Sequence, residues 1–179
     1  MPFSAPSPMA VLETERLTLR NASLDDAEFI LRLLNEPSFL RFIGDRGVRS
    51  VDAAERYITD RLIENYVRNG FGLWIVERKA LPGPIGICGL VKRDALPDAD
   101  IGFAFLPEFW SAGYAYESAL GVRDYAFGSL GLPRLLAIVN PDNGPSIRLV
   151  EKLGLQFERT IELSTKEPPV RVFALEASR

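Results

Sequence analysis

The stretch that decides the fold is Pro107-Glu108-Phe109-Trp110-Ser111-Ala112-Gly113-Tyr114-Ala115-Tyr116-Glu117. It follows an apolar run typical of a strand, 101–106, and it leads into a predicted helix, 113–130, that Gly131 ends. The first N–H groups of a helix have no partner within the helix, and the helix dipole makes that end positive. Small residues at Gly113 and Ala115 keep these N–H groups accessible. The pattern therefore predicts a binding site for a phosphate group.

A second segment, Asn143-Gly144-Pro145-Ser146-Ile147-Arg148-Leu149-Val150-Glu151-Lys152-Leu153-Gly154, follows further along the chain. Asn143 is a good N-cap residue, and Gly154 is typical of a helix end. A strand–turn–helix that can bind phosphate and a second capped helix together indicate an enzyme that uses a carrier nucleotide.

The rest of the chain alternates between strand and helix patterns without a repeat or a domain linker. We expect strands at 12–20, 71–79, 85–92, 101–106, 134–139, 155–163 and 170–177, and helices at 23–37, 50–70, 113–130 and 143–153. The runs at 71–79 and 85–92 predict a hairpin around Leu81-Pro82-Gly83-Pro84. This order predicts an α/β (α+β) fold with a mixed sheet of about seven strands and helices on both faces.

The composition excludes several classes of function. A length of 179 residues fits one domain, 1–179, and a net charge of -3 argues against nucleic-acid and anionic-membrane binding. The absence of histidine excludes Ser-His-Asp and Cys-His nucleophile pairs and every metal site that needs histidine. The single cysteine, Cys88, excludes an intramolecular disulfide. We therefore expect no metal and no nucleic-acid or membrane partner.

The N-terminal residues 1–9 are rich in Pro and Ser and carry no basic region. They predict a loose leader and not a signal peptide. No stretch has the ~20 apolar residues that a membrane-spanning helix needs. These features favour a cytoplasmic protein.

The two segments resemble those of the GNAT superfamily of N-acetyltransferases, and in particular its RimJ/RimL-like group of ribosomal-protein N-terminal acetyltransferases. The resemblance rests on Pro107 to Ser118, on the pattern Asn143-x-x-Ser146-x-x-Leu149-x-Glu151-Lys152-Leu153-Gly154, and on the opening Glu13-Thr14-Glu15-Arg16-Leu17-Thr18-Leu19-Arg20. It covers nearly the whole chain. It implies a GNAT-like domain whose mostly antiparallel sheet is flanked by four helices.

The resemblance also implies that acetyl-CoA is the cosubstrate. The turn before the third helix would hold the pyrophosphate, a strand splayed from its neighbour, here 103–106, would pair with the pantetheine arm, and Asn143 would face that arm. The implied cofactor-binding residues are Phe105, Leu106, Trp110, Ser111, Ala112, Gly113, Tyr114, Ala115, Asn143 and Ser146.

The implied reaction is direct attack of a neutral amine on the thioester in a ternary complex. A backbone N–H near Leu106 would stabilise the oxyanion. Many family members protonate the leaving thiolate with a tyrosine at a position that is Val150 here, so Ser146 becomes the candidate acid. Glu108 and Glu162 are base candidates, and Asp100 and Glu117 are further carboxylates near the implied site.

The acceptor is less constrained. An α-amine has a pKa of about 7.7–8.0, whereas a lysine amine has one near ~10.4, so a site without a strong base favours a protein N-terminus. The alternatives are a small-molecule amine, and, in another class, a non-catalytic acyl-CoA-binding module. Both a monomer and a homodimer are compatible with the sequence. The first two helices and the loop at Pro168 are expected to shape the acceptor pocket.

Overall fold

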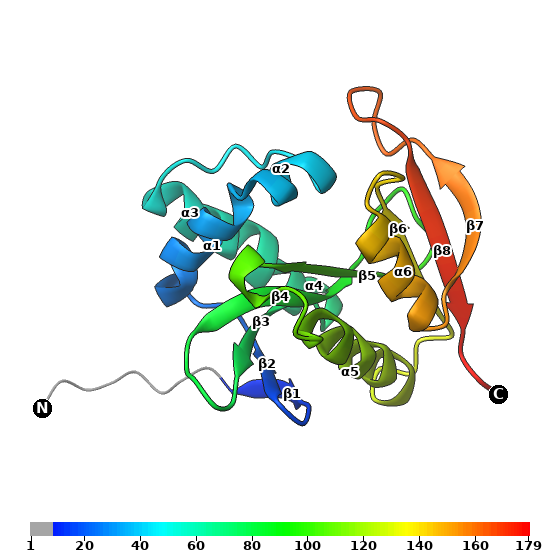
Figure 1. The fold of residues 1–179 in the computed structure, drawn as a ribbon, viewed down its shortest axis with the longest axis horizontal. Helices are drawn as coiled ribbons and strands as arrows, with labels where there is room; N and C mark the ends of the chain where they lie inside the picture. The colour runs from blue at the N-terminus through cyan, green and yellow to red at the C-terminus, as the bar shows by residue number, and fades with distance from the viewer. Residues whose placement is uncertain (1–8) are drawn as a thin grey trace, which may run out of the picture.

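The computed structural model describes residues 9–179, and the predicted leader lies largely outside them. Eight strands form one sheet in the order β1-β2-β3-β4-β5-β6-β8-β7 (Figure 1). Their bounds are β1 Ala10–Glu13, β2 Leu17–Arg20, β3 Leu73–Arg78, β4 Pro84–Val91, β5 Asp100–Phe105, β6 Arg134–Val139, β7 Gln156–Ile161 and β8 Val170–Glu176. Every neighbouring pair is antiparallel except β5–β6. The predicted mixed, mostly antiparallel sheet and the β3–β4 hairpin are confirmed.

The prediction of one strand at 12–20 is wrong, because this segment is the hairpin β1–β2. The turn between the two strands contains no glycine or proline. It is closed by the Thr14 N–H, which donates to the Leu17 carbonyl at 2.9 Å, and by the Leu17 N–H, which donates to Thr14 Oγ1 at 3.2 Å. A side-chain hydroxyl thus performs the role of a turn residue, and the alternation of apolar residues does not reveal it.

The helices are α1 Ala27–Leu34, α2 Pro37–Phe42, α3 Val51–Tyr57, α4 Glu64–Asn69, α5 Tyr114–Gly128 and α6 Gly144–Lys152. Short 3-10 turns, η1 Leu24–Asp26 and η3 Pro107–Phe109, precede α1 and α5, and the π-helical segment η2 Ile58–Ile63 joins α3 to α4. The predicted helix 50–70 therefore exists as α3-η2-α4. The expectation of four helices omitted α2, since Pro37 both ends α1 and occupies the first turn of a new helix.

The two larger apolar cores lie on opposite faces of the sheet, and a small third cluster contains Leu96, Leu136 and Val172. Helices α1 to α4 cover one face, where Ile30, Leu34, Ile58 and Ile75 are fully or almost fully buried. Helices α5 and α6 cover the other face (Figure 1), where the core includes the buried Trp74. Helices therefore lie on both faces of the sheet, as predicted, while the edge strand β7 is largely exposed.

A buried ionic network ties the start of α1 to the sheet. Arg20 donates two hydrogen bonds to Asp26, at 2.9 and 2.8 Å, and one to Glu77 at 3.0 Å. Asp26 also accepts from the Ser23 N–H at 2.8 Å, so its carboxylate closes the turn that begins the helical layer. The charged groups of Arg20, Asp26 and Glu77, each of which would be unfavourable if buried without a partner, are thus paired with one another.

Within residues 9–179 no helix is both long enough and apolar enough to cross a membrane. The same part of the chain contains no group of three or more His, Cys, Asp or Glu residues arranged to hold a metal ion.

Candidate active site

Strands β5 and β6 separate soon after they meet. Their only paired residues are Asp100 and Leu136, and the Leu136 N–H donates to the Ala99 carbonyl at 2.9 Å. Both strands run on beyond this pair, β5 to Phe105 and β6 to Val139. The parallel strands therefore splay at their carboxyl ends, and a row of β5 backbone groups is left to face the gap.

The alternation of an antiparallel ladder identifies those groups. The Leu106 N–H donates to the Ile85 carbonyl at 3.0 Å, so even-numbered residues of β5 face β4. The N–H groups of Phe103 and Phe105 consequently face the gap. Leu106 itself is buried, and its N–H has a partner, so the backbone N–H groups near Leu106 that face the gap belong to the odd-numbered residues.

Trp110 closes one end of this row. Its indole Nε1 donates to the Phe105 carbonyl at 2.9 Å, while the residue remains 51% exposed. The carbonyl is thus satisfied by a side chain, and no added strand can pair with β5 beyond this point.

The turn that follows is built from unusual backbone conformations. Ser111 has φ 64° and Gly113 has φ 82°, both in the left-handed region, and Gly113 is the N-cap of α5. A Cβ added to Gly113 would lie 3.3 Å from Arg16 Nη2. The positive φ favours glycine at this position, and a Cβ would also crowd the end of the Arg16 side chain. That a larger side chain would push a phosphate away stays a prediction.

Helix α6 begins as predicted. Asn143 is its N-cap, and its side-chain oxygen accepts from the Ser146 N–H at 3.3 Å. Ser146 lies one turn into the helix and is partly buried. Val150, at the position where a tyrosine would supply a proton, is fully buried in the core. Valine has no hydroxyl group, so Ser146 carries the only side-chain hydroxyl of α6.

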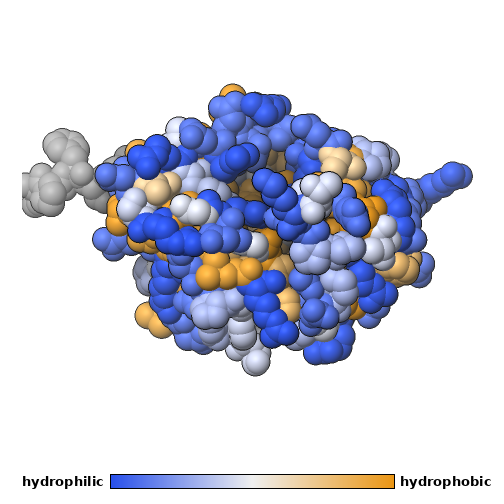
Figure 2. Space-filling model, turned by 90° about the horizontal axis from the view of Figure 1, so that it is seen from above, coloured by the Kyte–Doolittle hydropathy of each residue, from blue (hydrophilic) through white to orange (hydrophobic). Residues whose placement is uncertain are grey.

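Two cavities of about 500 Å³ each meet at the splay. The first is lined by the turn before α5, including Trp110, Ser111, Gly113, Tyr114 and Ala115, and is called the donor cavity after the role that is proposed for it below. The second lies between α2, the sheet and the β7–β8 loop at Pro168, and is called the acceptor cavity for the same reason. Residues that line both cavities are Phe39, Phe42, Ile43, Phe103, Ala104, Asn143 and Ser146. Figure 2 shows the hollowed face, with apolar surface recessed among hydrophilic side chains.

Of the four carboxylates that were predicted near the site, only Asp100 lines either cavity. Glu108 pairs with Arg32 at 2.7 Å, lies outside both linings, and has a pKa lowered by its own backbone N–H and by that arginine. Glu162 is exposed and also outside both linings. Glu117 is held by Thr14 and Arg16. The structure thus brings neither base candidate, Glu108 or Glu162, to the junction.

Three carboxylates line the acceptor cavity, Asp94, Asp100 and Glu167, and Asp100 is the buried one among them. It is 1% exposed, and its Oδ2 accepts from Arg93 Nε at 3.0 Å. Burial raises the pKa of Asp100 to about 6, although the charge and hydrogen bond of Arg93 oppose that rise. A carboxyl with this pKa is largely ionised at neutral pH and can still take up a proton.

Sequence reasoning missed the contribution of α2. Phe39, Phe42 and Ile43 of this helix and the following turn line both cavities. The available signal was Pro37, which is common in the first turn of a helix. The β7–β8 loop, which was predicted to shape the acceptor pocket, lines one of the two cavities through Leu163, Glu167 and Pro168.

Comparison with known proteins identifies the family. Residues 16–156 match the model of the Acetyltransferase (GNAT) domain. The chain belongs to the GNAT acetyltransferases. It is 35% identical to YoaA of Bacillus subtilis (strain 168), described as an uncharacterized N-acetyltransferase, over 83% of this chain and 84% of that protein.

Solved GNAT structures share the whole fold. An acetyltransferase from Agrobacterium tumefaciens is 26% identical and superposes with a TM-score of 0.79, covering 98% of this chain and 97% of that one. The RimL ribosomal L7/L12 alpha-N-protein acetyltransferase, solved with coenzyme A, is 14% identical with a TM-score of 0.79, covering 94% and 98%. The first likeness supports the family, and the second shows the fold alone.

Family membership makes this protein an acetyl-CoA-dependent N-acetyltransferase and removes the alternative of a non-catalytic acyl-CoA-binding module. The residues present suit the cosubstrate. Unpaired backbone groups on β5 suit an arm that carries amides, and the start of the fifteen-residue helix α5 suits a diphosphate.

Proposed function

We propose that this GNAT enzyme transfers the acetyl group of acetyl-CoA to the α-amine of a protein N-terminus, with Asp100 as the general base. The observation that carries the proposal is the position of Asp100, buried in the acceptor cavity with a pKa raised to about 6. No other carboxylate among the described residues combines burial with a place in that cavity.

The donor is proposed to lie along the splay. Its diphosphate binds at the Ser111 to Ala115 turn, and its pantetheine amides pair with Phe103 and Phe105 of β5. This arrangement brings the thioester to the junction of the two cavities, where the acceptor enters from the other side. Backbone N–H groups of β5 then stabilise the oxyanion.

The chemistry follows from this placement. Asp100 takes a proton from the ammonium group, and the nitrogen lone pair attacks the carbonyl carbon to form a tetrahedral intermediate with a negative oxygen and a positive nitrogen. Collapse of this intermediate breaks the C–S bond, and the thiolate leaves with the electron pair and takes the hydroxyl proton of Ser146. Ser146 regains a proton from the amide nitrogen, which becomes neutral, and Asp100 releases its proton to solvent. Because a thiol has a pKa near ~8.5, the thiolate leaves with modest help from an acid.

The pKa of Asp100 favours an α-amine. A base of pKa about 6 lies roughly two units below an α-ammonium group and more than four units below a lysine ammonium group. Each unit of that difference makes proton transfer about tenfold less favourable. The site therefore matches the acceptor that is already partly neutral at neutral pH.

A peptide panel tests the acceptor. Peptides with free or blocked N-termini, each with and without lysine, are incubated with acetyl-CoA beside polyamines, amino acids and aminoglycosides, and products are measured by mass spectrometry. Acetylation confined to free N-termini is expected. Acetylation of lysine side chains or of small amines alone would contradict the N-terminal assignment and leave the family assignment intact.

A further inference from the structure

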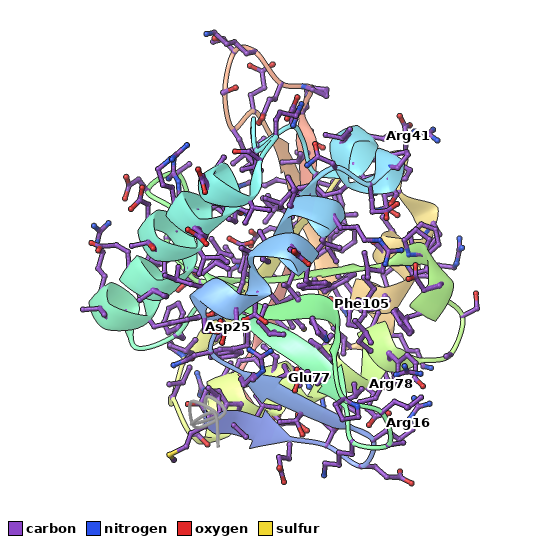
Figure 3. The ribbon with its side chains drawn as sticks, turned by 90° about the vertical axis from the view of Figure 1, so that its left-hand side faces the viewer. Arg16, Asp25, Arg41, Glu77, Arg78 and Phe105 are labelled. Atoms are coloured by element: carbon purple, nitrogen blue, oxygen red, sulfur yellow. The ribbon has the colours of Figure 1, made fainter. Side chains whose placement is uncertain are left out.

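The turn between β1 and β2 reaches across to the start of α5. Thr14 Oγ1 donates to Glu117 Oε1 at 2.7 Å, and the Arg16 backbone N–H donates to the same oxygen at 2.8 Å. The Arg16 side chain donates from Nε to Glu117 Oε2 at 2.6 Å and from Nη1 to the Ala112 carbonyl at 3.0 Å. Figure 3 shows Arg16 at the end of the molecule away from Arg41 of α2.

Glu117 stands in the first turn of α5, close to the proposed diphosphate. Burial opposes its ionisation, yet hydrogen bonds from Thr14 and from the backbone and side chain of Arg16 lower its pKa, so it is a carboxylate. An unpaired carboxylate here would repel a diphosphate. The guanidinium cancels that charge and leaves the positive helix end to act on the donor.

The hydrogen bond to Ala112 sets the direction of a peptide group. In a trans peptide the carbonyl and the next N–H point in opposite directions. Since Arg16 holds the Ala112 carbonyl, the Gly113 N–H points away from Arg16. Tyr114 reinforces this position, because the guanidinium lies 4.5 Å from the centre of its ring. Arg16 thus contacts the turn on the side opposite to the Gly113 N–H.

We infer that Arg16 is a positioning residue for the donor: it fixes the peptide between Ala112 and Gly113 and neutralises Glu117, so that the turn accepts a diphosphate. The inference rests on the proposed donor site. It assigns a role to the opening Glu13 to Arg20 segment, which the catalytic chemistry does not use.

The test compares two probes that differ in the diphosphate. CoA binding is measured by calorimetry, and binding of pantetheine, which ends before the diphosphate, is measured by NMR titration at millimolar concentrations. The variants are Arg16→Gln and Arg16→Lys, and the control is Arg68→Gln, which removes an exposed pair with Glu64 outside both cavity linings. Thermal unfolding of each free protein reports its folding.

Arg16→Gln is expected to weaken CoA binding about tenfold, the order of one charge-assisted hydrogen bond at a partly exposed site, and to leave pantetheine binding within about twofold. Arg16→Lys, which keeps the charge but cannot reach both partners in a planar fork, is expected to lie between Arg16→Gln and the natural protein. Arg16→Lys also provides the test of CoA binding if Arg16→Gln does not fold.

Two results would overturn the inference. One is unchanged CoA binding by a folded Arg16 variant, and the other is equal weakening of CoA and pantetheine, which would indicate general loss of structure. Failure of the natural protein to bind CoA would instead overturn the donor site itself.

Discussion

Replacement of Asp100 by asparagine should separate activity from stability. The substitution keeps the shape and an oxygen that can accept from Arg93 Nε, but it removes the proposed base. At pH 7 a carboxyl group with a pKa of about 6 is ionised in about nine molecules of ten, so nearly all of the natural enzyme is competent. Asp100→Asn should therefore lower kcat about 10²–10⁴-fold, the range typical of a general base.

The stability of the same variant should not fall. Burial raises the pKa of Asp100 from 3.8 to about 6, a change equivalent to about 3 kcal/mol against the ionised form. A carboxyl whose folded pKa is raised stabilises the protein fully below pH ~4, and this contribution is lost as the pH rises through about 6. At pH 7 to 8 Asp100→Asn should thus leave the free energy of unfolding unchanged or raise it by up to about 3 kcal/mol.

The assay follows thiol release from acetyl-CoA with a free N-terminal peptide between pH 5 and 9, beside urea unfolding. The natural enzyme should lose activity below pH 6, and the acidic limb with an apparent pKa near about 6 should disappear in Asp100→Asn. Arg93→Gln, which removes the opposing cation, should move that limb to higher pH. A folded Asp100→Asn enzyme with a rate within threefold of the natural one would refute the assignment of Asp100 as base.

Three further substitutions test other parts of the structure. Ser146→Ala should lower kcat by up to the ~10²–10⁴-fold range of acid–base groups with a smaller effect on CoA affinity by calorimetry, and a change in turnover under about threefold would return Ser146 to a structural role. Gly113→Glu should abolish CoA binding in a folded protein, since it places a carboxylate and bulk at the proposed diphosphate position, and unchanged binding would contradict the donor turn. Asp26→Ala should lower the free energy of unfolding by about 3–5 kcal/mol in urea, because it leaves Arg20 buried with only Glu77, and a loss below about 1 kcal/mol would contradict the importance of this network.

Much of the fold was predictable, because long periodic segments dominate it. The segment at 134–139 was expected as a strand and is β6 at the same bounds, and β3, β4 and β8 begin and end within two residues of their predictions. The errors come from short elements. The β1–β2 turn is closed by the Thr14 hydroxyl, and α2 is only six residues long, too short to show a helical period.

The site was predictable to the extent that it depends on local backbone chemistry. The turn before α5 and the Asn143 cap are each formed by residues that are contiguous in the sequence, so the residue types in each segment predict its backbone geometry. Which carboxylate is buried beside a cavity depends instead on segments that are distant in the sequence. Asp100 differs from Glu108 in burial and in its place beside a cavity formed by α2 and the β7–β8 loop, and neither property is written in the residues around it.

The most direct test of the donor site is amide hydrogen exchange, resolved by residue, with and without CoA. In the free enzyme the N–H groups of Phe103 and Phe105 face the splay, whereas the Ala104 N–H faces β4. Added CoA should slow exchange at Phe103 and Phe105 and leave Ala104 almost unchanged. Binding of CoA with no new protection at Phe103 or Phe105 would contradict the proposal that the pantetheine arm pairs with β5.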